Sequence, residues 1–600
     1  VVRDLRLAAD SFAERHHFNR PALVGPPVLL ADGFTSIELD GRRLAIVGML
    51  LIGLVTLTMT WSLWWSVVPI LAGWVVWLAA EAIMASLGLR LSLSGGPLVA
   101  QIIVLTMPAA SHLASHFRDE LRGSADRLHA AKHTLRVVSA PILWCAVTGA
   151  IGYGALVTSN VVPIRQFGLI LGVCTLTAAV LTMLISPVAM KPPFRMEITV
   201  RPGSTSKIST VLNWITEWVE RHPLPIVVGA LAIALPLTLG MLRLDYESNY
   251  INAFKPDSRI VQDYRAIETR LGGIGVVSLV VPSGQEITPE TIRTYERLDD
   301  QILDLRQADG KRAVSHVLSL ATVLDPEGLL AALPPDQFAD ALAAKLELIK
   351  LSPQSDLLGN FWNPEGGWAR LMMRVSERQP APVKEATFAG GLGLVRSQAY
   401  FGPRSYLTGL SFLLTQTTKG VMATSWTTFL WTAASILLML AIAFGGPKLA
   451  SLALLPTLLA VGLVLGLSGW LGVKLDIATA LVASVALGLS VDDTFHCLLQ
   501  FRRLRRELPF REALLASYAV SGPGVLLSSL AVALGFAVLR FSEFVPFSNF
   551  GAMVGVATLG SSLGNLILLP ACLTLGHRWS ERLASKAPSP LEVESPLSAE

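Results

Sequence analysis

The sequence predicts a polytopic α-helical membrane protein with two parallel five-helix repeats, one linking helix and an exterior α+β domain. Three observations lead to this fold class. Hydrophobic residues make up 52% of the chain and charged residues only 15%, whereas a soluble domain is about a quarter charged. The apolar residues are gathered in long segments, and two groups of these segments resemble each other in sequence. The chain must therefore face lipid over much of its surface.

Eleven apolar segments are long enough to cross a bilayer core of about 30 Å, which needs roughly 20 helical residues. Ten of them form two clusters of five, and 224–242 stands alone before a long polar stretch. The segments are 43–62, 64–88, 93–115, 137–157, 164–187, 224–242, 426–444, 450–471, 477–500, 517–540 and 547–574.

Basic residues in the short loops predict the orientation. One side carries clusters of Lys and Arg within 118–136, 191–221 and 502–511, together with Lys448. The opposite short loops hold Arg90, Arg165, Lys474 and Arg540. Because Lys and Arg are enriched in cytoplasmic loops, the first side is predicted to be cytoplasmic. The polar stretch 243–425 is then exterior, in the periplasm or outside the cell.

An internal repeat relates the two clusters. Residues 89–118 align without a gap to 473–502, and 138–168 align with one gap to 520–551. The register is fixed by shared residues, among them His112/His496, Phe117/Phe501, Arg118/Arg502 and Pro163/Pro546. Copies in the same orientation are typical of repeats related by an axis along the membrane normal.

The repeat also predicts the domains. The second bundle is preceded by one helix and an exterior domain, so a complete form is expected to carry the same before the first bundle, and this chain is expected to be N-terminally incomplete. The expected domains are a remnant of a first exterior domain (1–40), a first transmembrane bundle (41–190), a cytoplasmic linker (191–223), a single helix (224–242), an exterior α+β domain (243–425), a second bundle (426–575) and a disordered, Ser- and Pro-rich cytoplasmic tail (576–600).

Within the exterior domain, strand-like and helix-like patterns alternate. Short β-rich runs occupy 275–282, 369–377 and 404–410, and helical periodicity occupies 287–307 and 382–398. Pro, Gly and Asp between them mark turns. This order is typical of a small α+β domain.

Two adjacent carboxylates interrupt the span 477–500. Asp492 and Asp493 lie roughly 12 Å from its cytoplasmic end, where each charge costs about 3 kcal/mol on insertion scales. Because like charges repel, at least one is expected to hold or share a proton. His496 lies one helical turn away. A carboxylate–imidazole cluster at this depth is suited to taking up and passing protons. The alternative is a structural role, in which the carboxylates bind a neighbouring helix or line a wet vestibule.

Small residues precede the acidic pair. Ser484 and Gly488 stand at four-residue steps before Asp492, a spacing that predicts close helix packing near the site.

The first repeat differs from the second at the acidic positions. Pro108 and Ala109 replace the two carboxylates, while His112 occupies the place of His496. If the copies face each other, His112 lies near the pair, as a proton-relay partner or in an ordinary interhelical hydrogen bond.

Glu81 is a further buried candidate that nothing places near the pair. Ser528, Ser529 and Asn565 are expected to line a path or to bond neighbouring helices.

The segment "GLSVDDTFHCLLQFRR" (488–503), inside a five-helix repeat, resembles the resistance-nodulation-division (RND) superfamily. It is most similar to MMPL-type exporters, relatives of Patched and Dispatched with their sterol-sensing-type bundles. Residues 247–275 also resemble the start of the family's exterior domain. The resemblance implies twelve helices, ferredoxin-like, porter-type exterior domains and proton coupling at Asp492 and Asp493. The first repeat departs from it, because it lacks the acidic motif that many relatives carry.

Together these features lead to an expected function. We expect a proton-driven secondary exporter of a lipid or another hydrophobic substrate, in the cytoplasmic membrane of a bacterium. The alternative is a non-transporting lipid or sterol sensor, or a scaffold. The expected partners are membrane lipids, the substrate and protons, with a homo-oligomer left open. Neither an enzyme nor nucleic-acid binding is expected.

No cofactor or metal site is predicted from the sequence. Cys145, Cys174, Cys497 and Cys572 all fall in apolar runs, so they are expected to be small apolar fillers.

Overall fold

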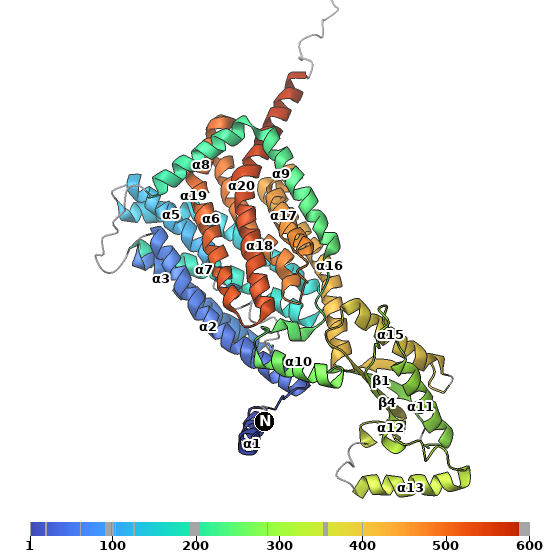
Figure 1. Cartoon of the computed structure of the whole chain (residues 1–600). Coiled ribbons are helices and arrows are strands. Elements are labelled where there is room, and N and C mark those ends of the chain that lie inside the picture. The colour runs from blue at the N-terminus through green and yellow to red at the C-terminus, as the bar shows by residue number, and fades with distance from the viewer. Residues whose placement is uncertain are drawn as a thin grey trace, which may run out of the picture. The chain divides into compact units, whose positions relative to one another are not determined.

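The computed structural model shows a mostly helical chain that divides into two compact units (Figure 1). The bundle unit comprises Ile37–Asp245, Ala423–Ser542 and Pro546–Glu600, and the α+β unit comprises Val1–Ser36, Tyr246–Met422 and Glu543–Val545. The structure describes residues 2–18, 21–60, 62–89, 98, 101–102, 104–123, 126–191, 204–284, 286–351, 358–398 and 400–586.

Among the described residues, ten helices are long and apolar enough to cross a membrane, which confirms a multi-pass membrane protein. They are α2 (Pro26–Thr60), α3 (Leu63–Ser86), α6 (Arg127–Gly154), α7 (Val162–Met190), α9 (Pro223–Thr238), α16 (Leu410–Phe444), α17 (Pro447–Trp470), α18 (Val482–Leu504), α19 (Phe510–Ala537) and α20 (Val545–Lys586). The expected span 93–115 lies partly outside the described residues, and α5 (Met107–Gly123) contains its end.

The repeat is visible in the bounds of the helices. α16 and α17 begin 384 residues after α2 and α3 and have the same lengths, 35 and 24 residues. α6 and α19 both have 28 residues, and each ends in a short 3₁₀ turn, η1 (Ala155–Thr158) or η5 (Val538–Phe541). The two copies therefore fold alike and run in the same order, as predicted.

Several helices extend beyond the apolar segments that predict them. α2 begins at Pro26 rather than near 43, and α16 begins at Leu410 rather than near 426. α20 continues to Lys586, so the first part of the segment expected to be disordered is helical; 587–600 lie outside the described residues. Hydropathy marks only the lipid-facing part of a helix, because backbone hydrogen bonding continues into its polar ends.

α18 lies at the centre of the bundle unit, between α6, α17 and α19 (Figure 1). In its most apolar window 89% of the residues are buried, against 28% in α16. Most side chains in this window of α18 are thus held against protein, polar ones included.

The expected linker 191–223 contains a helix that the sequence analysis missed. α8 (Ser204–Arg221) is amphipathic and packs on α19, crosswise to the long helices (Figure 1). Residues 192–203 lie outside the described part of the chain.

The α+β unit is built on an antiparallel sheet in the order β2-β4-β1-β5, with β3 also paired to β4. The strands are β1 (Gly275–Pro282), β2 (His316–Leu318), β3 (Trp362–Asn363), β4 (Trp368–Val375) and β5 (Tyr406–Thr408), and the α-helices include α10 (Arg259–Leu271), α11 (Pro289–Leu303), α12 (Leu320–Leu324), α13 (Pro335–Leu351) and α15 (Ala381–Ser397). The three expected strands are confirmed, while β2 and β3 are too short to give a periodic signal.

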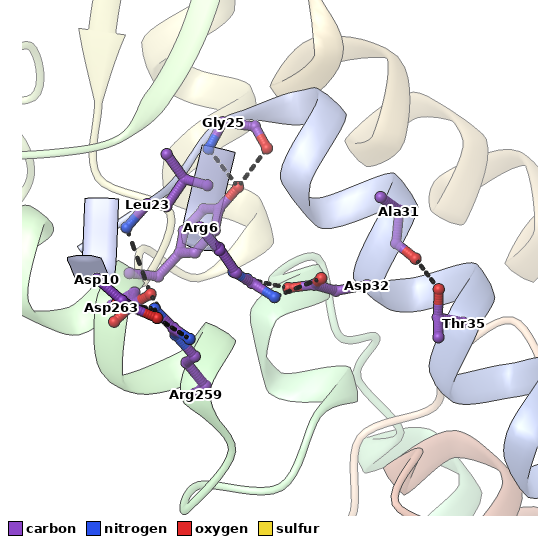
Figure 2. Close-up of polar contacts among 10 residues, drawn as sticks. Arg6, Asp10, Leu23, Gly25, Ala31, Asp32, Thr35, Arg259 and Asp263 are labelled. Carbon is purple, nitrogen blue, oxygen red and sulfur yellow. Dashed lines mark hydrogen bonds and ion pairs between the residues drawn. The ribbon is translucent and has the colours of Figure 1, made fainter. Parts of the chain in front are cut away.

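The N-terminal segment belongs to the α+β unit. Its helix α1 (Val2–His16) presents Asp10 to Arg259 of α10, at 2.9 Å, and the backbone N–H of Leu23 donates to Asp263 at 3.3 Å (Figure 2). Arg6 also pairs with Asp32 within the segment (Figure 2). Residues 1–36, expected to be part of a separate first domain, are thus grouped with the domain that follows α9.

Candidate functional site

The side chain of Asp493 is hydrogen-bonded to helix α19. Its side chain is buried, with 5% exposed. One carboxylate oxygen, Oδ1, accepts a hydrogen bond from Ser528 at 3.2 Å, and Oδ2 accepts a short one from Ser529. The two serines, expected to line a path or bond helices, therefore fix the orientation of this carboxylate.

Asp492 faces a different helix. Successive residues of a helix point about 100° apart, and the backbone carbonyl of Asp492 accepts from the thiol of Cys145 on α6 at 3.7 Å. Its buried Oδ1 has no hydrogen-bond partner among the described residues. The adjacent carboxylates are thus unequal, because Asp493 has two hydroxyl donors and Asp492 lacks a donor at Oδ1.

The structure brings the two repeat-related histidines together. The rings of His112 on α5 and His496 on α18 stack with centroids 3.5 Å apart and planes 16° apart. His112 is 4% exposed, and its Nε2 atom has no hydrogen-bond partner in the described part of the chain. Gly524 leaves room for this ring, since a Cβ there would lie 3.1 Å from Nδ1 of His112. The contact between the histidines is ring stacking.

A cavity of about 210 Å³ adjoins the stacked histidines. Its polar wall includes Ser115, His116, Asp119, Gln500, Arg503 and Ser521. Along α18 the lining runs from His496 to Arg503, roughly 10 Å at the helical rise. Its far end therefore lies at the basic end of α18, on the side predicted to be cytoplasmic.

Two further candidates, Asn565 and Glu81, make hydrogen bonds that are structural. Asn565 on α20 accepts from Thr494 at 3.0 Å, so it bonds α20 to α18 beside the acidic pair. Glu81 is exposed on α3 and accepts from Trp77 at 2.7 Å. Because Trp77 lies one turn away on the same helix, this contact is local and adds nothing to the acidic site.

The small residues before the acidic pair lie at a close helix crossing. A Cβ on Gly152 of α6 would lie 3.6 Å from the Cα of Gly488, and the ring of Tyr153 lies over Gly488. Ser484 is buried, with 2% exposed. Gln101 donates to the hydroxyl of Tyr153 at 3.0 Å. The sequence analysis missed Tyr153 and Gln101, for which repeat alignment and charge gave no signal.

All four cysteines are buried and unpaired. Within the described residues, no three His, Cys, Asp or Glu side chains are grouped closely enough to ligate one metal ion.

Comparison with known proteins establishes the family. The family model described as the MMPL family matches residues 11–226 and 298–589. A membrane protein of Methanocaldococcus jannaschii is 22% identical over 385 residues, which are 61% of this chain and 94% of that protein. A membrane protein of Streptomyces coelicolor is 35% identical over 144 residues, 23% of this chain and 20% of that protein.

Solved structures show the same fold. SecDF of Thermus thermophilus, a translocon-associated membrane protein, superposes with a TM-score of 0.54 at 15% identity, covering 91% of this chain and 63% of SecDF. SecDF in its super-membrane-facing form gives a TM-score of 0.51 at 16% identity, covering 92% and 64%. The chain thus spans somewhat less than two thirds of these structures. The family model covers most of the chain, so the chain belongs to the MMPL family.

Proposed function

We propose that this chain is a proton-driven secondary transporter that exports a lipid or another hydrophobic substrate from the cytoplasmic membrane of a bacterium. The observation that carries the proposal is the pair of partly buried Asp492 and buried Asp493, together with the stacked His112 and His496. Ionisable groups inside a membrane bundle are costly and mark ion or proton pathways. Membership of the MMPL family is consistent with transport.

In this proposal Asp492 is the first proton carrier. Its Oδ1 lacks a donor, so its charge is poorly stabilised there, and taking up a proton removes that charge. The proton passes to His496 one turn further along α18, and water in the cavity that both histidines line carries it to the unpartnered Nε2 of His112. Water in the adjoining cavity carries it toward Arg503 at the predicted cytoplasmic end. Asp493 stays oriented by its two serines and supplies negative charge beside the path.

Protonation also changes the forces between the repeats. A charged Asp492 favours an arrangement of α18 and α6 in which water reaches it, while a neutral one tolerates dry packing. His112 belongs to the first repeat and His496 to the second, so protonation of either ring acts across the boundary between repeats. Rocking of one bundle against the other would then open and close a route for the substrate.

The test uses the full chain in proteoliposomes that carry a fluorescent phospholipid, with acceptor vesicles outside and an imposed pH gradient. We expect gradient-dependent transfer by the parent and none by the variant D492N/D493N. The matched control is E81Q, which also removes a carboxylate from a spanning helix but outside the site. Transfer by D492N/D493N at the parent rate would refute proton coupling at this pair.

One observation favours a second function. Pro108 and Ala109 leave the first repeat without carboxylates at the acidic positions, so the site is single rather than symmetric. A lipid sensor or scaffold would bind lipid but move none under any pH gradient. If the folded parent protein binds lipid but transfers none under any pH gradient, the function is lipid sensing or scaffolding and not transport.

A further inference from the structure

An apolar groove lies between the crosswise helix α8 and the long helices α19 and α20. It has a volume of about 330 Å³ and is lined only by apolar atoms. Its walls include Ile208, Leu212 and Ile215 of α8, Leu526 of α19, and Leu563 and Ile567 of α20. Water would find no hydrogen-bond partner there, so the groove needs an apolar occupant.

The groove opens toward the surroundings of the bundle. Leu563 is 53% exposed on one wall and Val211 is 55% exposed on the other. Both belong to the unit that contains the membrane-spanning helices. The medium that reaches such an opening is the acyl-chain region of the bilayer.

α8 has the features of a helix at the membrane interface. Trp214 and Trp218 are exposed on one side, while Leu212 and Val219 are buried against the bundle. Tryptophan is enriched where acyl chains meet headgroups, and amphipathic helices lie in that plane.

Ion pairs hold α8 at the ends of the two long helices. Arg511, near the start of α19, pairs with Glu217 at 3.1 Å and with Glu220 at 3.5 Å. Arg578 on α20 pairs with Glu220 at 3.2 Å. Arg221 at the end of α8 adds a third cation to these two carboxylates. These ion pairs fix the C-terminal part of α8 to α19 and α20, the two long helices that form the other walls of the groove.

We propose that this groove binds one acyl chain of a membrane phospholipid. A methylene group occupies roughly the volume of a water molecule, about 30 Å³, so the groove holds on the order of ten methylenes. Each one buried there contributes about 0.8 kcal/mol relative to water. The surrounding bilayer also buries acyl chains, so the shape of the slot between α8, α19 and α20 provides the preference for this site. The site does not depend on whether the chain transports.

The test is native mass spectrometry of the full chain after transfer from phospholipid nanodiscs into detergent. In L563W a larger side chain fills the groove from an exposed position, so the fold should tolerate it. The matched control is V556W, on the same helix and 56% exposed but outside the groove. We expect the parent and V556W to retain one phospholipid per chain, and L563W to retain it at least tenfold less.

Two results would overturn the inference. One is equal phospholipid retention by L563W and V556W, which places the lipid elsewhere. The other is a parent that retains no phospholipid or carries a second copy of the chain in its place. Cross-linking with a phospholipid that carries a photoreactive acyl chain shows where the lipid binds. The peptides of α8 and α20 should be labelled in the parent and in V556W, and labelled less in L563W. Equal melting temperatures of the two variants check that L563W is folded.

Discussion

The two neighbouring carboxylates show how helical geometry gives adjacent residues different chemistry. Asp493 points to α19 and receives two hydroxyl donors, whereas the backbone carbonyl of Asp492 contacts α6 and Oδ1 of its side chain lacks a donor. A buried carboxylate with two donors is stabilised in its charged form, and one without them is not. This difference is why the proposed function assigns the fixed charge to Asp493 and the exchanging proton to Asp492.

The stacked histidines give the first residue-level prediction. In G524A the new Cβ lies 3.1 Å from Nδ1 and 3.4 Å from Cε1 of His112, so the ring must shift away from His496. Ala favours the helix by up to about 1 kcal/mol, so the protein should stay folded. We expect gradient-driven lipid transfer to slow about tenfold, the factor that 1.4 kcal/mol represents.

The control for this prediction is G229A on α9, where no atom lies within 4 Å of the added Cβ. Transfer rates are measured in the same proteoliposomes, with melting temperature as a check on folding. If G524A and G229A both match the parent, the position of His112 does not matter for transfer.

Asp299 in the α+β unit gives a second residue-level prediction. Burial raises the pKa of this carboxyl from 3.8 to about 7, and neighbouring Asp300 and Glu296 act in the same direction, against hydrogen bonds from Ser319 and Thr322. The folded state then binds the proton more tightly than the unfolded state. Stability should therefore fall as pH rises from about 4 to about 7 and stay low above that.

The variant D299N should remove this pH dependence. We expect hydrogen exchange of the α12 amides, corrected for intrinsic rates, to be slower in D299N than in the parent at pH 8. The two should be equal near pH 4. D340N, which removes an exposed carboxylate of α13, is the control. An unchanged pH dependence in D299N would show that another group is responsible.

The main residues of the candidate site could be predicted from the sequence because they are polar residues within apolar spans or repeat-related partners of such residues. Asp492 and Asp493 are charged within an apolar span, and His112 is found through its repeat partner His496. Tyr153 and Cys145 could not be predicted, since a single weakly polar residue on an apolar helix is common in cores. Ring stacking depends on side-chain rotamers across two helices, which no one-dimensional pattern encodes.

At the scale of elements, the sequence predicts apolar spans better than helix ends. Lipid imposes a length on α18 or α7 that hydropathy detects. The polar beginnings of α2 and α16 and the short helix α8 carry no such signal. α8 is stabilised by tertiary packing of one apolar face on α19, and packing of this kind is decided by residues far away in the sequence.

A buried ion pair fixes α15 to the end of β4. Lys384 and Glu377 are both fully buried and bonded to each other, and Nζ of Lys384 also donates to the carbonyl of Ser248 at 3.3 Å. Removing one partner leaves the other charge buried and unpaired. We expect K384M to destabilise the α+β unit by about 3–5 kcal/mol.

The double variant K384M/E377L should recover most of that loss, because it removes both charges. Hydrogen exchange of the α15 amides in the full chain measures both variants. If the double variant is as unstable as K384M, lost packing rather than an unpaired charge explains the effect.

At the scale of the whole molecule, the helices of the bundle are repeated but the acidic pair is not. The matched bounds of α2 and α16 or α3 and α17 show two copies of one bundle. The acidic pair, however, is present only in the second copy, and the first contributes a histidine. Under the proposed function, a repeated scaffold would then present a single proton site at the boundary between its copies, and the two copies would differ in function.

The orientation of the molecule gives the last prediction. The excess of Lys and Arg predicts that the connection between α18 and α19 is cytoplasmic and that the α+β unit is exterior. All four native cysteines are buried, so a membrane-impermeant maleimide should label the parent weakly. Asp309 in the α+β unit and Arg506 after α18 are both exposed. In intact cells D309C should be labelled and R506C should not, while permeabilised cells should label both. The reverse pattern would invert the predicted topology and, with it, the direction of the proposed proton path.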